Sequence, residues 1–160
     1  MTLFKNIPEE IEEQILSICN QDEEFPRVVR FIDHNSELTK NDFLPSFVDP
    51  KARCCRENMS NKGGMAKMLS SQRQNEKLTM NDCCVSLRLP TTRAEFANEF
   101  KKMRRHFRYI ALGKTDKKKG CAHNNAGTHV MYFLKDYDEN NPYSDFDIIE
   151  EELLWKVKSL

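Results

Sequence analysis

Hydrophobic and polar residues alternate along several short segments in the C-terminal half of the chain. The clearest segment is residues 83–89, CCVSLRL, which is followed directly by Pro90. Alternation with a period of two is typical of a strand with one buried face, and a proline ends such a strand. The same pattern predicts three further strands, at residues 108–113, 128–135 and 143–149.

Between the first two of these strands, the hydrophobic period changes to that of a helix. The apolar residues recur every three or four positions and would share one helix face: Phe96, Phe100, Met103 and Phe107. Thr92 and Glu95 have the spacing of a capping box, in which each side chain accepts a hydrogen bond from the other's backbone N–H. We therefore predict an amphipathic helix over residues 93–107.

The N-terminal half is predicted to carry helices. Pro8 and the glutamates that follow it suit a first helical turn, and Ile11, Ile15 and Ile18 form one apolar face. Residues 27–35, RVVRFIDHN, fit either a short helix or a strand. The aromatic and aliphatic residues that follow are expected to pack onto the core: Phe43, Leu44, Phe47 and Val48.

Together these elements predict an α+β fold with a small, mostly antiparallel sheet in the C-terminal half. We expect residues 1–160 to form a single domain, because this length is enough for one core. Within it, residues 51–81 contain few large apolar residues, and Gly63 and Gly64 interrupt them. We interpret 51–81 as a mobile or surface-laid segment. At the C-terminus, residues 151–160 are compatible with a short helix.

The net charge of zero conceals three blocks of opposite sign. Residues 1–50 hold 4 basic and 11 acidic side chains, a net charge of −7. Residues 51–119 hold 18 basic and 6 acidic side chains, net +12, and residues 120–160 hold 3 and 8, net −5. The middle block is therefore where an anionic partner would bind.

The sequence gives no sign of a membrane or an export pathway. No apolar run approaches the roughly 18 residues that span a bilayer, and residues 1–8 lack a signal-peptide stretch. We therefore expect a cytoplasmic protein. The cysteines are then expected to be reduced thiols, since two adjacent pairs and two single residues do not resemble a secreted disulfide framework: Cys19, Cys54, Cys55, Cys83, Cys84 and Cys121.

Residues 113–129 contain one candidate nucleotide-binding motif and two candidate catalytic residues. Gly113-Lys114-Thr115 resembles the end of a phosphate-binding loop, but Arg108 occupies the position where that loop needs its first glycine. His129 begins a predicted strand beside a glycine, a position from which it could act as an acid–base group. Cys121 could serve as a nucleophile activated by the nearby lysines.

A zinc site is a third hypothesis. Structural zinc usually takes four Cys or His ligands in two pairs, with two to four residues between partners. The adjacent cysteine pairs have no spacer, and Cys121 and His123 are one residue apart. We therefore predict no metal and no cofactor, while Cys121 and His123, with one residue from each cysteine pair, stay as candidate ligands. In the alternative, Cys83 or Cys84 fills the core.

The strongest signal is the concentration of basic residues between 101 and 119. Most of them lie off the apolar face of the predicted helix or in the turn after the next strand: Lys101, Lys102, Arg104, Arg105, Arg108, Lys114, Lys117, Lys118 and Lys119. If the two groups converge, they form one positive surface suited to phosphates or to an acidic protein. Alternatively, the acidic blocks fold against them.

Our first hypothesis is accordingly an interaction protein without chemistry of its own. It would bind a larger protein or a nucleoprotein assembly through the basic block, residues 51–119. The alternative is an enzyme that acts on a phosphate-bearing substrate, a nucleotide or nucleic acid, with His129 as the acid–base group. On either hypothesis residues 113–129 are expected to form a charged connecting loop.

Overall fold

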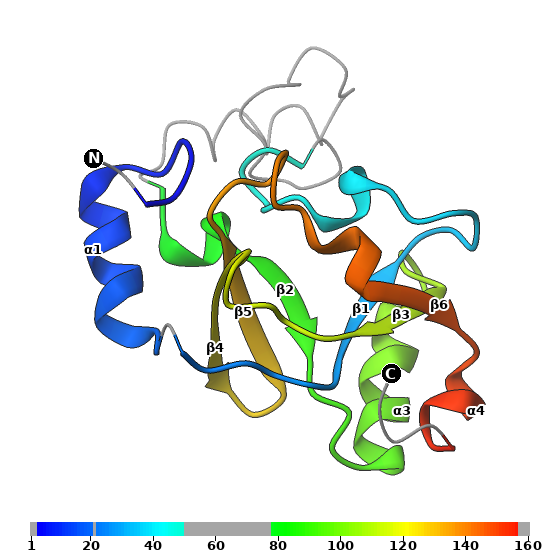
Figure 1. Cartoon of the computed structure of the whole chain (residues 1–160). Helices are drawn as coiled ribbons and strands as arrows, with labels where there is room; N and C mark the ends of the chain where they lie inside the picture. The colour runs from blue at the N-terminus through cyan, green and yellow to red at the C-terminus, as the bar shows by residue number, and fades with distance from the viewer. Residues whose placement is uncertain (1–2, 21, 50–77, 157–160) are drawn as a thin grey trace, which may run out of the picture.

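The computed structural model describes residues 3–20, 22–49 and 78–156. Most of the segment predicted to be mobile or surface-laid, 51–81, lies outside the described residues, as do Cys54 and Cys55. The described residues form an α+β arrangement around one six-stranded sheet, in the order β4-β5-β2-β1-β3-β6 (Figure 1). Every neighbouring pair of strands in this sheet is antiparallel, so the predicted fold class is confirmed.

The strands run from Val28–Ile32 (β1), Val85–Arg88 (β2), Tyr109–Gly113 (β3), Gly120–Ala126 (β4), His129–Leu134 (β5) and Phe146–Ile149 (β6). The α-helices are Glu9–Ile18 (α1), Arg93–Met103 (α3) and Glu151–Leu154 (α4). Three 3-10 turns complete the described elements, at Lys40–Phe43 (η1), Met80–Cys83 (η3) and Pro142–Asp145 (η4). All four predicted strands are therefore present, and the undecided segment 27–35 contains a strand.

One prediction was wrong: residues 113–129 are not simply a connecting loop. Their centre, Gly120–Ala126, forms the edge strand β4 and pairs with β5 along its length. Gly120 permits this pairing, because a Cβ atom there would lie 2.4 Å from the Phe133 carbonyl oxygen. The register with β5 shifts between Asn124 and Ala126, in a polar stretch whose sequence does not show the alternation typical of a strand.

The predicted helix is also shorter than expected. It begins after Thr92, whose side chain caps the Glu95 N–H, and it ends at Met103 rather than at residue 107. Phe107 nevertheless packs against the cluster that the helix covers. The apolar spacing therefore identified the buried face correctly but continued into the turns beyond the helix.

The helices lie against different parts of the sheet (Figure 1). α3 and α4 cover one face of the β1–β3 half, where Phe31 stacks on Phe100 with ring centroids 5.6 Å apart. α1 packs near β4 and β5 in a larger cluster that also contains Phe43 and Phe146. No helix of the described residues has the length and apolar character needed to cross a membrane.

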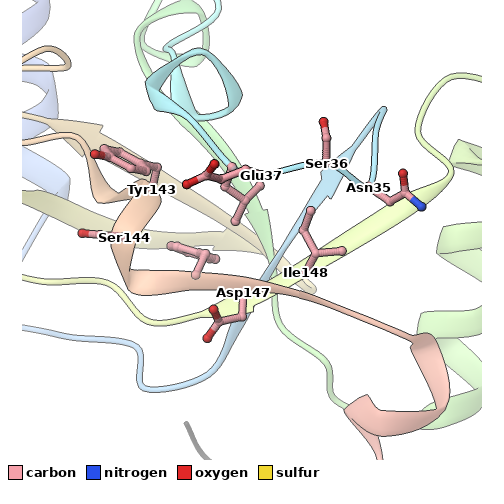
Figure 2. A pocket seen from close by; sticks show the side chains of 9 residues that line it. Asn35, Ser36, Glu37, Tyr143, Ser144, Asp147 and Ile148 are labelled. Atoms are coloured by element: carbon pink, nitrogen blue, oxygen red, sulfur yellow. The ribbon is translucent and has the colours of Figure 1, made fainter.

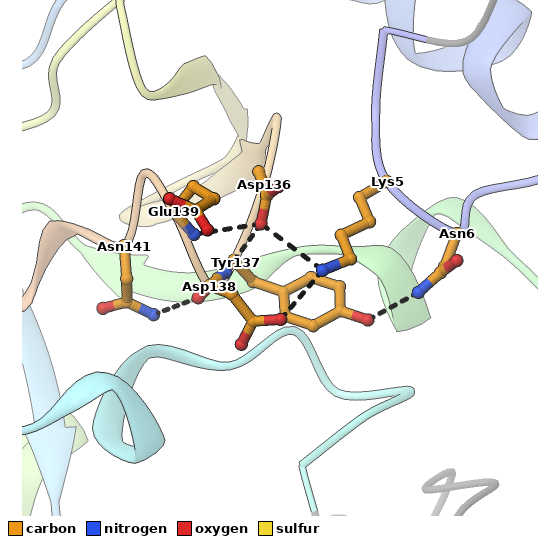
Figure 3. Close-up of polar contacts among 7 residues, drawn as sticks. All are labelled: Lys5, Asn6, Asp136, Tyr137, Asp138, Glu139 and Asn141. Carbon is orange, nitrogen blue, oxygen red and sulfur yellow. Dashed lines mark hydrogen bonds and ion pairs between the residues drawn. The ribbon is translucent and has the colours of Figure 1, made fainter.

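Polar contacts attach the N-terminal segment to the turn after β5 (Figure 3). The Lys5 backbone N–H donates to the Lys135 carbonyl at 2.8 Å, and its ammonium group pairs with Asp138 at 2.9 Å. Asn6 donates to the Tyr137 hydroxyl at 2.8 Å. The Asn141 amide lies within hydrogen-bonding distance of three backbone carbonyls, at 2.9–3.2 Å, which holds this turn against η1. These residues have a structural role.

The middle of the sheet contains a short seam. β1 pairs with β3 over five residue pairs, whereas its register with β2 contains the single pair Val29 and Arg88. The Arg30 guanidinium crosses this seam, because its Nη1 donates to the Ser86 carbonyl at 2.9 Å. A side chain therefore supplements the backbone ladder where the ladder is shortest.

Candidate functional site

A pocket of about 250 Å³ lies over this seam, and we call it the β1–β2 pocket. β1 contributes Arg30 and Phe31, and β2 contributes Ser86 and Arg88. The end of α3 and the turn after it add an apolar wall, and the loop after η1 adds two polar residues: Met103, Phe107, Ser46 and Asp49. Two arginines, a serine and a carboxylate thus surround a space that is apolar on one side.

Arg30 is fixed in position by backbone carbonyls. Its Nε donates to the Asp42 carbonyl at 3.1 Å, in addition to the Nη1 bond to Ser86. Burial lowers the pKa of Arg30, and the nearby Asp49 carboxylate opposes this effect. Because the ordinary pKa of an arginine side chain is far above neutral pH, Arg30 stays charged at pH 7. The two bonds use two of its five N–H donors.

His129 reaches the pocket through Ser86. β2 and β5 pair with Arg88 opposite His129, which places His129 and Ser86 on one face of the sheet. The His129 Nε2 atom lies 3.1 Å from the Ser86 hydroxyl. Burial, and then the positive charge of Arg88, lower the pKa of His129 below its ordinary value. The imidazole is therefore neutral at pH 7 and can accept a proton.

Arg88 is held less firmly than Arg30. Its Nε lies 4.0 Å from Glu99 Oε2, at the limit of an ion pair. That carboxylate oxygen is buried and has no hydrogen-bond partner among the described residues, while Oε1 accepts a bond from the Thr128 hydroxyl. Arg88 thus brings a positive charge to the pocket that its own carboxylate neighbour only partly neutralises.

Five of the nine predicted basic residues are chain neighbours of two residues that line this pocket. The basic helix end comprises residues that are all exposed and that flank Met103 and Phe107 in the chain: Lys101, Lys102, Arg104, Arg105 and Arg108. Arg104 lies over the Phe100 ring, 5.0 Å from its centroid. None of the five forms an ion pair with another described residue.

The remaining basic residues form the lysine turn: Lys114, Lys117, Lys118 and Lys119. This turn follows the end of β3, whereas the basic helix end precedes its start, so the five-residue strand separates them by about 13 Å. Acidic residues meet the lysine turn, since Lys119 pairs with Asp145 at 2.7 Å and the Lys117 N–H donates to Glu24 at 2.8 Å.

The Gly113-Lys114-Thr115 segment has a structural role. Thr115 is buried, donates its N–H to the Phe25 carbonyl and accepts the Phe25 N–H at its hydroxyl. A Cβ at Gly113 would lie 2.4 Å from the Asp145 carbonyl oxygen. Both residues therefore hold neighbouring segments together.

Among the residues that the structure describes, the candidate metal ligands Cys83, Cys84, Cys121 and His123 do not form a group that could hold an ion. Cys121 and His123 lie on β4 opposite Phe133 and Met131, and Cys121 is buried. In the described ranges, one group of three ligating side chains is close enough to share an ion: Asp33, His34 and Asp42. His34 Nε2 already lies 2.6 Å from Asp42 and its Nδ1 lies 2.9 Å from Ser36, so these residues satisfy one another.

A second concavity, of about 400 Å³, lies between the loop after β1 and the segment around β6 (Figure 2). Its ionisable side chains near the surface are Glu37, Asp147 and Tyr143, and no cationic side chain lines it. This concavity is unsuited to an anion, in contrast to the β1–β2 pocket.

Sequence reasoning identified His129 but missed the residues around it. Arg30 lies inside the apolar run RVVRF, and Ser86 alternates with core residues, so each looked like an ordinary strand position. The one available signal was an arginine flanked by buried aliphatic residues, which is rare without a partner. Comparisons with protein-family models, curated proteins and solved structures found no match for this chain.

Proposed function

We propose that the protein binds a phosphate-bearing substrate in the β1–β2 pocket and acts on it through His129. The observation that carries this proposal is a pocket lined by two arginines and by Ser86, whose hydroxyl lies 3.1 Å from the Nε2 atom of His129 behind it. Arginine binds phosphate with paired, charge-assisted hydrogen bonds. A neutral histidine in hydrogen-bond contact with a hydroxyl is the arrangement that general-base catalysis requires.

In this proposal the two arginines differ in role. Arg30, held by the carbonyls of Asp42 and Ser86, presents its remaining donors in a fixed orientation. Arg88 adds charge at the rim. Because Asp49 offsets part of the Arg30 charge, the second arginine gives the site a net attraction for an anion.

His129 would move the proton. This step needs the proton on Nδ1, which places the amide oxygen of Asn125, whose side chain lies 3.5 Å away, toward that nitrogen. Nε2 then accepts the hydrogen of the Ser86 hydroxyl, or of a water beside it, as the oxygen attacks the phosphorus. The ester P–O bond breaks, and the leaving oxygen takes the proton from His129. The arginines would stabilise the charge that develops on the phosphate oxygens.

The surroundings favour a nucleotide or a nucleic acid over inorganic phosphate. Phe31, Met103 and Phe107 supply an apolar wall of the kind that a base can contact. The exposed cations of the basic helix end, which begin next to Met103, would attract further phosphates.

Binding tests this function directly. A nucleoside monophosphate is titrated against the full chain and followed by NMR, with Arg88→Gln compared with Lys117→Gln. Losing a charge-assisted contact should weaken binding by about 10- to 100-fold in Arg88→Gln. Lys117→Gln, which removes an equal charge outside the pocket, should change affinity by less than about 3-fold. Equal effects of the two variants would contradict the proposed site.

The first hypothesis from the sequence, binding to a larger acidic or nucleoprotein partner, remains a second candidate. It is favoured by the exposure of all five cations of the basic helix end without an ion pair among the described residues. Reversing Arg105 and Arg108 to Glu should abolish capture of short single-stranded RNA at low salt. Unchanged capture, with the same salt dependence, would exclude this surface.

A further inference from the structure

Two thiols from distant parts of the chain meet near the edge of the sheet. Cys19 directly follows α1, and Cys121 lies in β4. Both are buried in the same core cluster, each thiol is the largest influence on the pKa of the other, and neither is in a disulfide. We refer to Cys19 and Cys121 as the thiol pair.

A pocket of about 250 Å³ leads to one member of the pair. Cys121 lines it together with three lysines, Lys117, Lys118 and Lys135, and with the single carboxylate Asp22. Cys19 is not among the residues that line this pocket. A small polar molecule entering it would therefore meet Cys121 first, within a mostly positive surrounding.

The electrostatics separate the two thiols. Donation by the Cys19 S–H, followed by the charge of Lys135, lowers the pKa of Cys121, while burial and Glu23 act in the opposite direction. The same hydrogen bond, with burial, raises the pKa of Cys19. Cys121 is thus the more readily ionised thiol and Cys19 the less readily ionised one, which is the difference expected between a nucleophilic thiol and its resolving thiol.

We propose that the thiol pair is an oxidation site at which a hydroperoxide converts Cys19 and Cys121 into a disulfide. The Cys121 thiolate attacks the terminal oxygen of the hydroperoxide, the O–O bond breaks, and the leaving alkoxide or hydroxide takes a proton. The Cys19 sulfur then attacks the Cys121 sulfenic acid, forming the S–S bond. The departing hydroxide and the Cys19 proton leave as water. Two thiols are oxidised and one hydroperoxide is reduced.

The other described cysteines lack these features. Burial is the main cause that raises the pKa of Cys84, to about 11, and its sulfur donates to the Asn81 carbonyl. Neither Cys83 nor Cys84 is among the residues that line the pocket at Cys121. Oxidation should therefore be selective for the thiol pair over these two. This inference does not depend on the proposed function of the β1–β2 pocket.

The test uses the full chain with Cys54→Ser and Cys55→Ser, treated with a small excess of hydrogen peroxide. Intact mass should fall by about two hydrogens, and peptide mapping without reductant should show Cys19 joined to Cys121. Cys19→Ser should stop at a sulfenic acid that dimedone traps on Cys121. Cys121→Ser should slow oxidation by about tenfold or more, whereas Cys84→Ser should behave as the parent.

A second measurement covers the case in which a cysteine variant fails to fold. Iodoacetamide labelling of the unsubstituted chain, followed peptide by peptide against pH, should modify Cys121 at a lower pH than Cys84. A disulfide between other cysteines, or labelling of Cys84 at the same pH as Cys121, would overturn the proposal.

Discussion

The β1–β2 pocket and the concavity beside the lysine turn are both lined by basic side chains, but among the described residues only the pocket has a lining cation that backbone carbonyls hold in position. In the pocket, Arg30 is anchored by two backbone carbonyls. In the turn, Lys117 and Lys118 are exposed, and the bonds that hold them come from their backbone N–H groups. A cation that is already oriented loses less entropy when it binds a ligand. A cation whose position is fixed by the fold is therefore a better indication of a binding site than a high number of basic residues in one stretch of sequence.

The two regions also differ in their neighbours. The pocket is lined by the Ser86 hydroxyl, which is in contact with the imidazole of His129 and could pass a proton to it. The concavity beside the lysine turn, of about 490 Å³, contains Glu24 and Asp116, which compete with any incoming anion. Both regions therefore contain carboxylates beside their cations, but only the β1–β2 pocket also has a serine in contact with a histidine.

The largest expected difference between the regions is in catalysis. Substituting His129→Gln should reduce turnover of a nucleotide or oligonucleotide substrate by about 10²- to 10⁴-fold, because the base is lost. Lys118→Gln should leave the rate within about 3-fold. Product formation measured by mass spectrometry over a panel of nucleotides checks this prediction. Turnover that survives in His129→Gln would remove the imidazole from the mechanism.

The next largest difference is in stability. Arg30→Met leaves the Asp42 and Ser86 carbonyls without their donors and removes the charge beside Asp49, at a cost of about 3 kcal/mol in the free energy of unfolding. Lys114→Met, on an exposed side chain, should change it by less than about 0.5 kcal/mol. Urea unfolding compares the two. Similar midpoints would show that Arg30 is not an anchored residue.

Gly113, the last residue of β3, should matter more for the stability of the fold than the lysines of the turn that follows it. Gly113→Ala brings a methyl group within 2.4 Å of the Asp145 carbonyl and 2.5 Å of the Phe146 ring, which should cost about 1–3 kcal/mol. Lys117→Ala should be neutral within about 0.5 kcal/mol. Thermal unfolding of both variants measures this contrast. If Gly113→Ala is tolerated, the contact between β3 and η4 is looser than described.

The smallest expected effect is on the pH dependence of stability. Burial and Arg88 lower the pKa of His129 in the folded state, while the unfolded value is about 6.5. The unfolded state therefore binds more protons as the pH falls, so this contribution is complete above about pH 6.5 and is lost on acidification. The free energy of unfolding should decline less steeply below pH 6.5 in His129→Gln. An unchanged slope would indicate an ordinary histidine pKa.

The sequence was sufficient for elements with a regular period and insufficient for contacts between them. The spacing of Phe96 and Phe100 and the cap at Thr92 located α3, because local packing and capping determine them. β4 was missed, since its outer half, HNNA, is exposed at an edge and carries no alternation. An edge strand is stabilised by its partner, which a local pattern does not reveal.

The candidate site illustrates the same limit. Arg30, Ser86 and His129 are separated by more than forty residues each, and strand register alone brings them together. His129 could be identified because histidine chemistry is visible in any context. Arg30, which would bind the substrate, could not be identified from the sequence, because its fixed position depends on the backbone carbonyls that surround it in the fold.

The short seam between β1 and β2 has a mechanical consequence. The single residue pair joins a β4-β5-β2 half to a β1-β3-β6 half, so the amides along this line should exchange with solvent earlier than those inside either half. Arg30 comes from one half, and Ser86 and Arg88 come from the other. A ligand bound by both arginines would therefore link the two halves of the sheet. Ligand binding would then be measurable as slower deuterium uptake at Val29 and Arg88.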